Sequence, residues 1–454
     1  MSPLDQRLAT QLAQARAQDL HRVRRIVEGG HGARIVVDGR DCLNFCSNDY
    51  LGLATDPRLA EAARAALGQG TGSGAAALVS GYNREHAALE EELADFLQRP
   101  RALLFSSGWA ANLGVLRALL GREDVLIADE LNHASLIDGG RLAGARYVRV
   151  PHADVAAYAA ALQDEAPLPL AGRGWGRGAV AAGGLAPKSP ETRERVTGEC
   201  PSGADLPPPR DWLLGTDSMS VPSSANRPPR KGEGDFRLIA TDSVFSMDGD
   251  LAPLAELSRL SIEHGATLMV DDAHGFGVLG PDGRGALAAT GAEADILMAG
   301  FGKALGTAGA CIVGSEPLID YLVQRARTWV FSTAPPPALA AATRASLRLI
   351  RSEEGRQRRA RLQAHIARFR AGAAQLGLPL SASETAIQPL VLGEAARAMA
   401  VSRALYQRGH WVAAIRPPTV PAGTSRLRIT LSAAHSEAEI DGLLTALAEA
   451  LRAA

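Results

Sequence analysis

The sequence predicts an α/β fold in which a mostly parallel central sheet is followed by a smaller C-terminal α+β domain. From residue 101 onward, short apolar runs rich in strand-forming residues alternate with helical stretches. This alternation is typical of chains that build a parallel sheet with helices on both faces. Two of the runs, residues 266–270 and 296–299, end in polar residues, as strands do at the sheet edge where open α/β folds bind ligands.

The elements up to the end of this sheet are expected in a regular order. An amphipathic helix is expected over residues 1–27, and a β-hairpin over residues 33–45, turned at Asp38-Gly39. Residues 57–67, with Asp56 as the cap, and residues 84–98 are expected to be helical. The strands are expected at residues 103–105, 125–127, 147–150, 238–240, 266–270 and 296–299, with helices from Gly108, from His133, to about residue 164 and from about residue 253.

The remaining chain divides into two kinds of segment. After Pro335, a long helical stretch is followed by a strand at 387–392, a helix at 394–408, a strand at 426–431 and a final helix. We therefore expect three parts: an N-terminal arm (1–56), a large domain (57–334) and a small domain (335–454). Within the large domain, residues 166–235 are crowded with Pro and Gly, about 30% of the stretch, as in low-complexity chain. This segment is expected to be a disordered insertion with little part in catalysis.

Composition excludes several classes of partner. The formal net charge of the 454 residues is −1, which gives no indication of a nucleic-acid or membrane-surface partner. The N-terminus has no apolar core of the kind found in signal peptides. The four cysteines form no CxxC pair and no zinc spacing, so a reducing, cytoplasmic environment is expected.

The polar residues that follow the two strands suit one cofactor, pyridoxal phosphate. Asp271 and His274 come after the first strand, and Lys303 comes after the second. A lysine amine can form a Schiff base with the cofactor, and a carboxylate beside the pyridine nitrogen keeps that nitrogen protonated, so that the ring acts as an electron sink. The histidine is expected to hydrogen-bond the phenolic oxygen of the ring.

Other interpretations of these segments remain open. Asp271, Asp272 and His274 have side chains that are ordinary metal ligands, although a metal would leave Lys303 without a role and no metal site is expected. The Gly300–Lys303 segment is also compatible with a simple tight turn. It is not a P-loop, because Ala304 follows the lysine where Ser or Thr is needed. The glycine-rich residues 68–74 follow a predicted helix and not a strand, which speaks against a dinucleotide site.

The motifs taken together resemble those of the α-oxoamine synthases, a family of fold-type-I pyridoxal-phosphate enzymes. The resemblance covers nearly the whole chain apart from residues 166–235, and residues 415–421 with Arg426 and Arg428 most favour the branch that serves biotin biosynthesis. The motifs that carry it are SNDYLG (47–52), VSGY (79–82), FSSGWAAN (105–112), DELNHAS (129–135), VFSMDG (244–249), VDDAH (270–274) and FGK (301–303).

The resemblance implies roles for individual residues of the cofactor site. Lys303 would be the Schiff-base lysine and Asp271 the partner of the pyridine nitrogen. His274 and Ser246 would bracket the phenolic oxygen, and His133 would stack on the ring face. The amides of Gly108 and Trp109, at a helix start, would hold the phosphate, because the helix dipole favours an anion there. Thr333 would reach the phosphate from a neighbouring subunit, which implies a homodimer.

The resemblance also implies the reaction. Arg22, Arg416, Thr419 and Arg428, with His133, would bind substrate, since an arginine fork matches a carboxylate. The implied activity is a decarboxylative condensation of L-alanine with a pimeloyl thioester of coenzyme A or of an acyl carrier protein. A sister enzyme that condenses glycine with a short acyl-CoA, or a non-catalytic scaffold of the same fold, is the alternative.

Two positions depart from the pattern of that family. Gly300 stands where a threonine usually donates its hydroxyl to the phosphate, which removes one expected hydrogen bond. Asp242 stands where glutamate is common, and is a shorter acid of the same charge.

Overall fold

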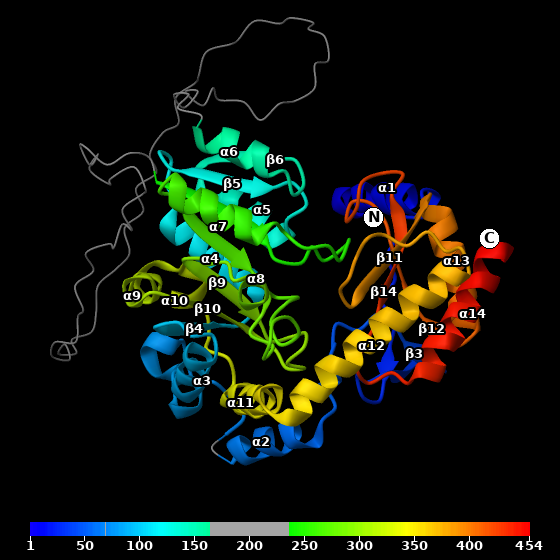
Figure 1. The fold of residues 1–454 in the computed structure, drawn as a ribbon, viewed down its shortest axis with the longest axis horizontal. Coiled ribbons are helices and arrows are strands. Elements are labelled where there is room, and N and C mark those ends of the chain that lie inside the picture. Colours follow the sequence, from blue (N-terminus) through cyan, green and yellow to red (C-terminus); the bar gives the residue numbers. More distant parts are fainter. Residues whose placement is uncertain (69, 164–235) are drawn as a thin grey trace, which may run out of the picture. The chain divides into compact units, whose positions relative to one another are not determined.

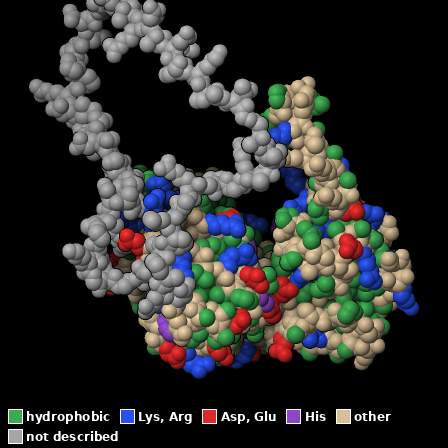
Figure 2. Space-filling model, turned by 90° about the horizontal axis from the view of Figure 1, so that it is seen from above, with side chains coloured by type: hydrophobic (Ala, Val, Ile, Leu, Met, Phe, Trp, Pro, Cys, Tyr) green, Lys and Arg blue, Asp and Glu red, His purple; other side chains and the backbone are tan. Residues whose placement is uncertain are grey.

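The computed structural model of the protein describes residues 1–68, 70–163 and 236–454 (Figure 1). The insertion predicted at residues 166–235 lies outside the described residues. Within the described ranges no helix is both long and apolar enough to cross a membrane. Lys and Arg side chains are interspersed with Asp and Glu over the face shown in Figure 2, in line with the small net charge.

A seven-stranded sheet forms the centre of the described chain, and it confirms the α/β prediction. The strand order is β4-β10-β9-β8-β7-β5-β6. Pairing is parallel from β9 through β8, β7 and β5 to β6, and β10 is antiparallel to both of its neighbours. The strands are β4 (Arg101–Phe105), β5 (Val125–Asp129), β6 (Arg146–Val150), β7 (Arg237–Asp242), β8 (Thr267–Asp271), β9 (Ile296–Gly300) and β10 (Ala310–Gly314).

One strand of this sheet was absent from the sequence prediction. β10 follows the glycine-containing turn after Lys303 so closely that its apolar residues merge with those of β9 into a single run. Its partner β4 lies about two hundred residues earlier in the chain. Since a pairing of this kind depends on the order of strands in space, the local pattern of Ala310–Gly314 does not reveal it.

The two faces of the sheet are both buried, which explains the near-continuous apolar runs of its strands. Successive residues alternate between two apolar clusters: Val270 and Leu297 face one cluster, and Met269 and Met298 face the other. Helices α4 (Gly108–Leu119), α5 (Ala134–Ala143) and α9 (Glu316–Arg325) contribute to the second cluster. Helices α3 (Arg84–Phe96), α6 (Val155–Gln163), α7 (Leu254–Glu263) and α11 (Pro337–Arg351) contribute to the first.

The N-terminal helix is shorter than predicted. α1 spans Pro3–Ala17, with a capping box at Ser2 and Asp5, and no residue of it is buried. Residues 18–26 are not helical, because Asp19 takes a left-handed conformation (φ 55°) and its carbonyl accepts a hydrogen bond from Arg416. The helix therefore stops where tertiary contacts with a distant loop begin, ten residues before the predicted end at residue 27.

The predicted hairpin is confirmed. β2 (Arg34–Val37) pairs antiparallel with β3 (Arg40–Asn44) around Asp38-Gly39, and β1 (Val27–Glu28) pairs with β2. β3 also pairs in parallel with β12 (His410–Trp411), so that N-terminal and C-terminal segments share one sheet. Helix α2 (Pro57–Leu67) begins at its predicted cap, Asp56, whose side chain accepts from the amide of Arg58 at 3.1 Å.

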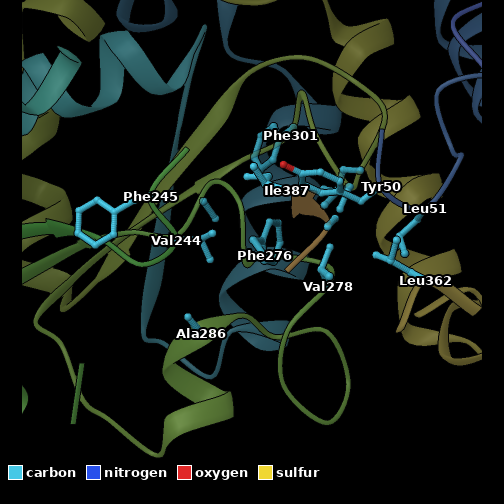
Figure 3. Packing of buried hydrophobic residues seen from close by; sticks show 14 of the residues in the cluster. Tyr50, Leu51, Val244, Phe245, Phe276, Val278, Ala286, Phe301, Leu362 and Ile387 are labelled. Atoms are coloured by element: carbon cyan, nitrogen blue, oxygen red, sulfur yellow. The ribbon is translucent and has the colours of Figure 1, made fainter. Parts of the chain in front are cut away.

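The C-terminal segment contains a three-stranded antiparallel sheet with helices. The sheet has the order β11-β14-β13, and α12 (Glu353–Gln375), α13 (Ala395–Gln407) and α14 (Glu437–Ala453) accompany it. Its strands are β11 (Ile387–Gly393), β13 (Ala413–Ile415) and β14 (Ser425–Thr430). The first apolar cluster runs on from the central sheet to include Leu362 and Ile387, two of the residues drawn in Figure 3.

Candidate active site

A cavity of about 650 Å³ lies at the carboxyl ends of β7, β8 and β9. Residues from β14 and from the segment after β3 complete its wall, among them Arg428 and Cys46. Of the residues predicted for the site, those that line the cavity are Gly108, Trp109, His133, Ser246, Asp271, His274, Lys303 and Arg428. Residues far apart in the sequence therefore face one space, at the sheet edge where ligands bind in such folds.

Asp271 ends β8 and is buried. Both of its carboxylate oxygens accept hydrogen bonds: Oδ2 from Asn112 Nδ2 at 2.7 Å, and Oδ1 from the amide of Ala273 at 3.0 Å. The same Asn112 nitrogen donates to Ser135 Oγ at 2.8 Å. Donors on both oxygens stabilise the ionised carboxylate, the form needed to pair with a protonated pyridine nitrogen.

Lys303 lies on the turn after β9 and is half-buried. Burial lowers the pKa of its amine below the usual range, while the carboxylate of Asp271 acts in the opposite direction. Lys303 is the only lysine among the described residues, because the other two of the chain, Lys188 and Lys231, lie in the segment outside them. An amine that gives up its proton more readily than an exposed lysine suits a nucleophile or a base.

The environment of His274 determines which of its ring nitrogens carries a proton. The Tyr50 hydroxyl lies 2.5 Å from His274 Nδ1 and 3.4 Å from Asn48 Oδ1. Burial raises the pKa of Tyr50 to about 12 and holds the pKa of His274 well below its usual value. We therefore assign Tyr50 as donor to Nδ1, which leaves the proton of the neutral imidazole on Nε2. His274 can then donate a hydrogen bond from Nε2, as the predicted role requires.

The start of α4 provides a place for an anion. Ser107 caps the helix and its Oγ accepts from the amide of Ala110 at 3.1 Å. The amides of Gly108 and Trp109 belong to the first turn of the helix, where no intrahelical carbonyl is available to them. A Cβ atom at Gly108 would lie 3.1 Å from Met298 Cε, so this position is already tight. Phosphate groups bind at such helix starts.

His133 and Trp109 form one side of the cavity. Their rings meet edge to face, with centroids 6.2 Å apart and an angle of 81° between the ring planes. His133 is also the N-cap of α5, and its Nδ1 lies 2.7 Å from Ser135 Oγ. The side chain of Trp109 is 43% exposed. Both rings are thus accessible from the cavity and are not packed away in the core.

Arg428 is buried and is held from several sides. Its Nε donates to the carbonyl of Ser246 at 2.6 Å, and its Nη1 donates to Asn48 Oδ1 and Thr430 Oγ1, each at 3.0 Å. These hydrogen-bond partners are all neutral. A buried guanidinium whose described partners carry no charge is suited to receive a carboxylate.

Four predicted residues do not line the cavity. Arg22 donates to Thr419 Oγ1 at 3.2 Å, and Arg416 donates to the carbonyl of Asp19. The three predicted residues Arg22, Arg416 and Thr419 therefore share one region. This region meets the cavity wall at Ile415, the residue before Arg416. Thr333 is exposed and forms an isolated β-bridge with Ala76. The roles predicted for these four residues, like those predicted for the residues that line the cavity, stay predictions.

The metal alternative has no counterpart in the described residues. No group of three or more His, Cys, Asp or Glu side chains there could hold a metal ion. Asp272, unlike Asp271, accepts from Ser243 Oγ at 2.5 Å and from the amide of Ala286 at 3.0 Å. A Cβ atom at Gly285 (φ +100°) would lie 1.8 Å from Asp272 Oδ2, so glycine is required for this close approach.

The cavity fits the predicted cofactor. It offers a lysine amine, a carboxylate with donors on both oxygens, an imidazole with a free N–H and a helix start for the phosphate. Sequence reasoning did not single out Asn112 or Tyr50, which hold Asp271 and His274 in place. These two residues lie inside the motifs at 105–112 and 47–52. The sequence signal that could have indicated them was a polar residue type among glycine and aromatic residues.

A histidine outside the cavity bridges two carboxylates, one at the end of β5 and one in the segment after β7. His152 Nδ1 lies 3.1 Å from Asp129 Oδ1, and its Nε2 lies 2.6 Å from Asp250 Oδ2. Asp129 ends β5, and Asp250 follows the loop that carries Ser246. Hydrogen bonds with these two carboxylates raise the pKa of His152 to about 10, and Asp129 makes the larger contribution. The imidazolium form therefore joins the loop of Ser246 to the neighbouring strands at neutral pH.

We expect His152→Ala to lower the free energy of unfolding by about 2 kcal/mol at neutral pH, because both carboxylates lose a donor. The folded-state pKa is raised, so this stabilisation is fully present below the unfolded pKa of about 6.5 and is lost as pH rises through about 10. Urea unfolding at neutral and at alkaline pH measures it, with the exposed His31→Ala as control. A destabilisation of the same size at both pH values would contradict the charged bridge.

Comparisons with known proteins show the family of the chain. The family model described as aminotransferase class I and II matches residues 40–169 and 228–447. The chain is 49% identical over 447 residues to the 8-amino-7-oxononanoate synthase of Methylococcus capsulatus, covering 98% of both chains. It is 47% identical over 453 residues to that of Alkalilimnicola ehrlichii, covering 99% of this chain and 98% of the relative.

A solved structure shows the same fold. A serine palmitoyltransferase from S. paucimobilis with bound PLP has a TM-score of 0.79 at 25% identity, covering 100% of this chain and 99% of the other. The predicted fold type and the predicted cofactor are thereby confirmed. The chain belongs to the aminotransferase class I and II family and, within it, to the 8-amino-7-oxononanoate synthases, pyridoxal-phosphate-dependent acyltransferases of biotin biosynthesis.

Proposed function

We propose that the protein condenses L-alanine with a pimeloyl thioester, releasing CO2 and the free thiol and forming 8-amino-7-oxononanoate. The observation that supports this most directly is the grouping of Lys303, Asp271 and the uncompensated cation Arg428 around one cavity. Relatives named for this product support the choice among sister reactions.

Each residue around the cavity has its own proposed role in the reaction. Bound pyridoxal phosphate supplies an electron sink for the charge that forms at Cα of the amino acid. Lys303, its pKa lowered by burial, accepts the proton from that Cα and returns one to the product. Asp271 would supply the negative charge that keeps the pyridine nitrogen of the bound cofactor protonated. The amides of Gly108 and Trp109 would hold the phosphate, His133 would stack on the ring face, and Ser246 and His274 would bind the phenolic oxygen.

Arg428 is proposed to bind the carboxylate of L-alanine, with Arg416, Arg22 and Thr419 serving the acyl substrate. We expect Arg428→Ala to weaken binding of L-alanine by about 30-fold, near 2 kcal/mol, because the carboxylate loses a charged donor. Titration of the cofactor absorbance with L-alanine measures this.

Arg416→Ala is the matched control, since Arg416 lies outside the cavity lining and should leave the L-alanine titration close to that of the parent. The assignment of Arg428 is wrong if its alanine variant, with cofactor still bound, gives the parent's titration curve.

Gly300→Thr is expected to keep or tighten cofactor binding, by about 1 kcal/mol, because a hydroxyl would be added near the phosphate. Gly300 ends β9 without a left-handed backbone, so threonine is compatible with its conformation. The new Cβ would lie 3.2 Å from Ala273 Cβ, a contact that needs a small adjustment. Gly300→Ala adds this contact without the hydroxyl and is the control. Equilibrium dialysis of the cofactor that gave weaker binding for threonine than for alanine would contradict the prediction.

A homodimer is proposed on the basis of an apolar surface beside the site. Leu78, Val79 and Phe331 are exposed, and the Ala76–Thr333 bridge connects their segments. Helix α10 (Arg327–Val330), which precedes Phe331, is joined to α4 through the hydrogen bond from Thr328 Oγ1 to the carbonyl of Ala110. A second copy would cover these side chains and bring its Thr333 to the phosphate. Sedimentation should then give twice the mass of one chain.

The decisive experiment is product identification by mass spectrometry. The purified protein is incubated with L-alanine or glycine and with acetyl, succinyl and pimeloyl thioesters, the last on both coenzyme A and an acyl carrier protein. We expect 8-amino-7-oxononanoate from L-alanine and a pimeloyl thioester, and the two carriers identify the physiological donor. A preference for glycine and a short acyl-CoA would establish the sister reaction instead. The reaction is expected to take place in the cytoplasm.

A further inference from the structure

A second buried carboxyl group stands next to Asp271. Asp242 ends β7, and its Cα is the register partner of Asp271 at the end of the neighbouring parallel strand β8. Asp242 is 4% exposed and Asp271 is 6% exposed, and both line the cavity. Two carboxylates this close in a buried site would repel each other, so the pair is not expected to carry two negative charges.

The hydrogen bonds of the two groups differ. Asp271 has a donor on each oxygen, Asn112 Nδ2 on Oδ2 and the amide of Ala273 on Oδ1. Asp242 has one on Oδ2 only, the amide of His133 at 2.8 Å, while its Oδ1 is buried without a hydrogen-bond partner in the described structure. A buried carboxylate oxygen without a donor costs more when the group is ionised than when it is a neutral carboxylic acid, because the charged form loses more solvation.

We propose that Asp271 and Asp242 divide the two protonation states between them: Asp271 carries the negative charge of the site, and Asp242 is a neutral carboxylic acid that positions His133. The Oδ2 atom of the neutral acid still accepts from the amide of His133 and thereby fixes this residue, which is the N-cap of α5. The ring of His133 borders the cavity. Lys303 and the cofactor then face one negative charge instead of two.

The groups around Asp242 agree with a neutral form. Burial raises its pKa well above the usual value, and the negative charges of Asp271 and Asp129 act in the same direction. The amide of His133 and the ammonium of Lys303 act in the opposite direction. The amide of Asp242 itself donates to Asn132 Oδ1 at 3.0 Å, which holds the residue in place whichever form it takes.

Asp242→Asn tests the proposal, because asparagine keeps the shape and cannot ionise. In the parent, the unfolded chain ionises Asp242 above a pKa of about 3.9 while the folded chain keeps the proton, so the parent loses stability as pH rises towards the raised folded pKa. The asparagine variant does not lose this stability, because asparagine does not ionise. We therefore expect the melting temperature of Asp242→Asn, relative to the parent, to rise between about pH 5 and pH 8 in the full-length protein, with cofactor bound and after its removal.

Turnover of the Asp242 variants is the second measurement. Asp242→Asn, which keeps an acceptor for the amide of His133, should retain more of the parent's kcat than Asp242→Ala, which loses that acceptor, and should keep the parent's pH profile of kcat/KM. A melting-temperature difference that stays constant or falls with pH would show that Asp242 is not a neutral acid in the folded protein. An asparagine variant no more active than the alanine variant would contradict its role in positioning His133, and either outcome would overturn the proposal. The inference rests on the proposed site, but the melting temperatures of the cofactor-free protein do not depend on its substrate, so the two can fail separately.

Discussion

Lys303→Ala is expected to lower turnover by about 10⁴-fold or more, the largest effect of any substitution considered, because the variant loses the base that moves the Cα proton. The fold should survive, since Lys303 lies on a turn at the cavity and makes no ion pair among the described residues. Steady-state rates, with thermal unfolding as a check on folding, measure the effect.

Chemical mapping tests the same residue directly. Borohydride reduction of the parent followed by peptide mapping should find a pyridoxyl group on the peptide of Lys303. Lys188→Arg and Lys231→Arg, which change the other two lysines of the chain, are the matched controls and should keep both the adduct and the activity. An adduct on another residue, or normal turnover in Lys303→Ala, would end the assignment.

Asp271→Asn is expected to lower turnover by about 10²-fold or more, because the variant loses the charge that stabilises the protonated pyridine nitrogen. Its Oδ1 can still accept from the amide of Ala273, so the local structure should be retained. The cofactor absorbance should change, since the electronic state of the ring depends on that nitrogen. Stopped-flow and steady-state measurements with L-alanine check the rate.

Asp272→Asn distinguishes this effect from simple destabilisation. Burial raises the pKa of Asp272 to about 7, and its carboxylate oxygens accept hydrogen bonds from Ser243 Oγ and from the amide of Ala286. This variant should lower the melting temperature more than it lowers the rate per folded molecule. If Asp271→Asn instead kept full turnover with an unchanged cofactor spectrum, the charge at this position would have no part in catalysis.

Much of the fold follows from local pattern. The strands of the central sheet except β10, the hairpin at Asp38-Gly39 and the cap of α2 at Asp56 were predictable because apolar periodicity and turn residues act over a few neighbours. The end of α1 was not, because it depends on Asp19 and its contact with Arg416, almost four hundred residues away in the sequence.

The candidate site divides in the same way. The sequence by itself determined that a lysine, an acid and a histidine follow neighbouring strands, and the motifs around them determined the family and the cofactor. Only the tertiary structure decided that Asn112 holds Asp271, that Asp242 lies beside it with one oxygen unpartnered, and that β14 brings Arg428 to the cavity. The reason is physical: strand order in the sheet sets these distances, and residues 159 positions apart in the chain, such as Asn112 and Asp271, meet only once the sheet has formed.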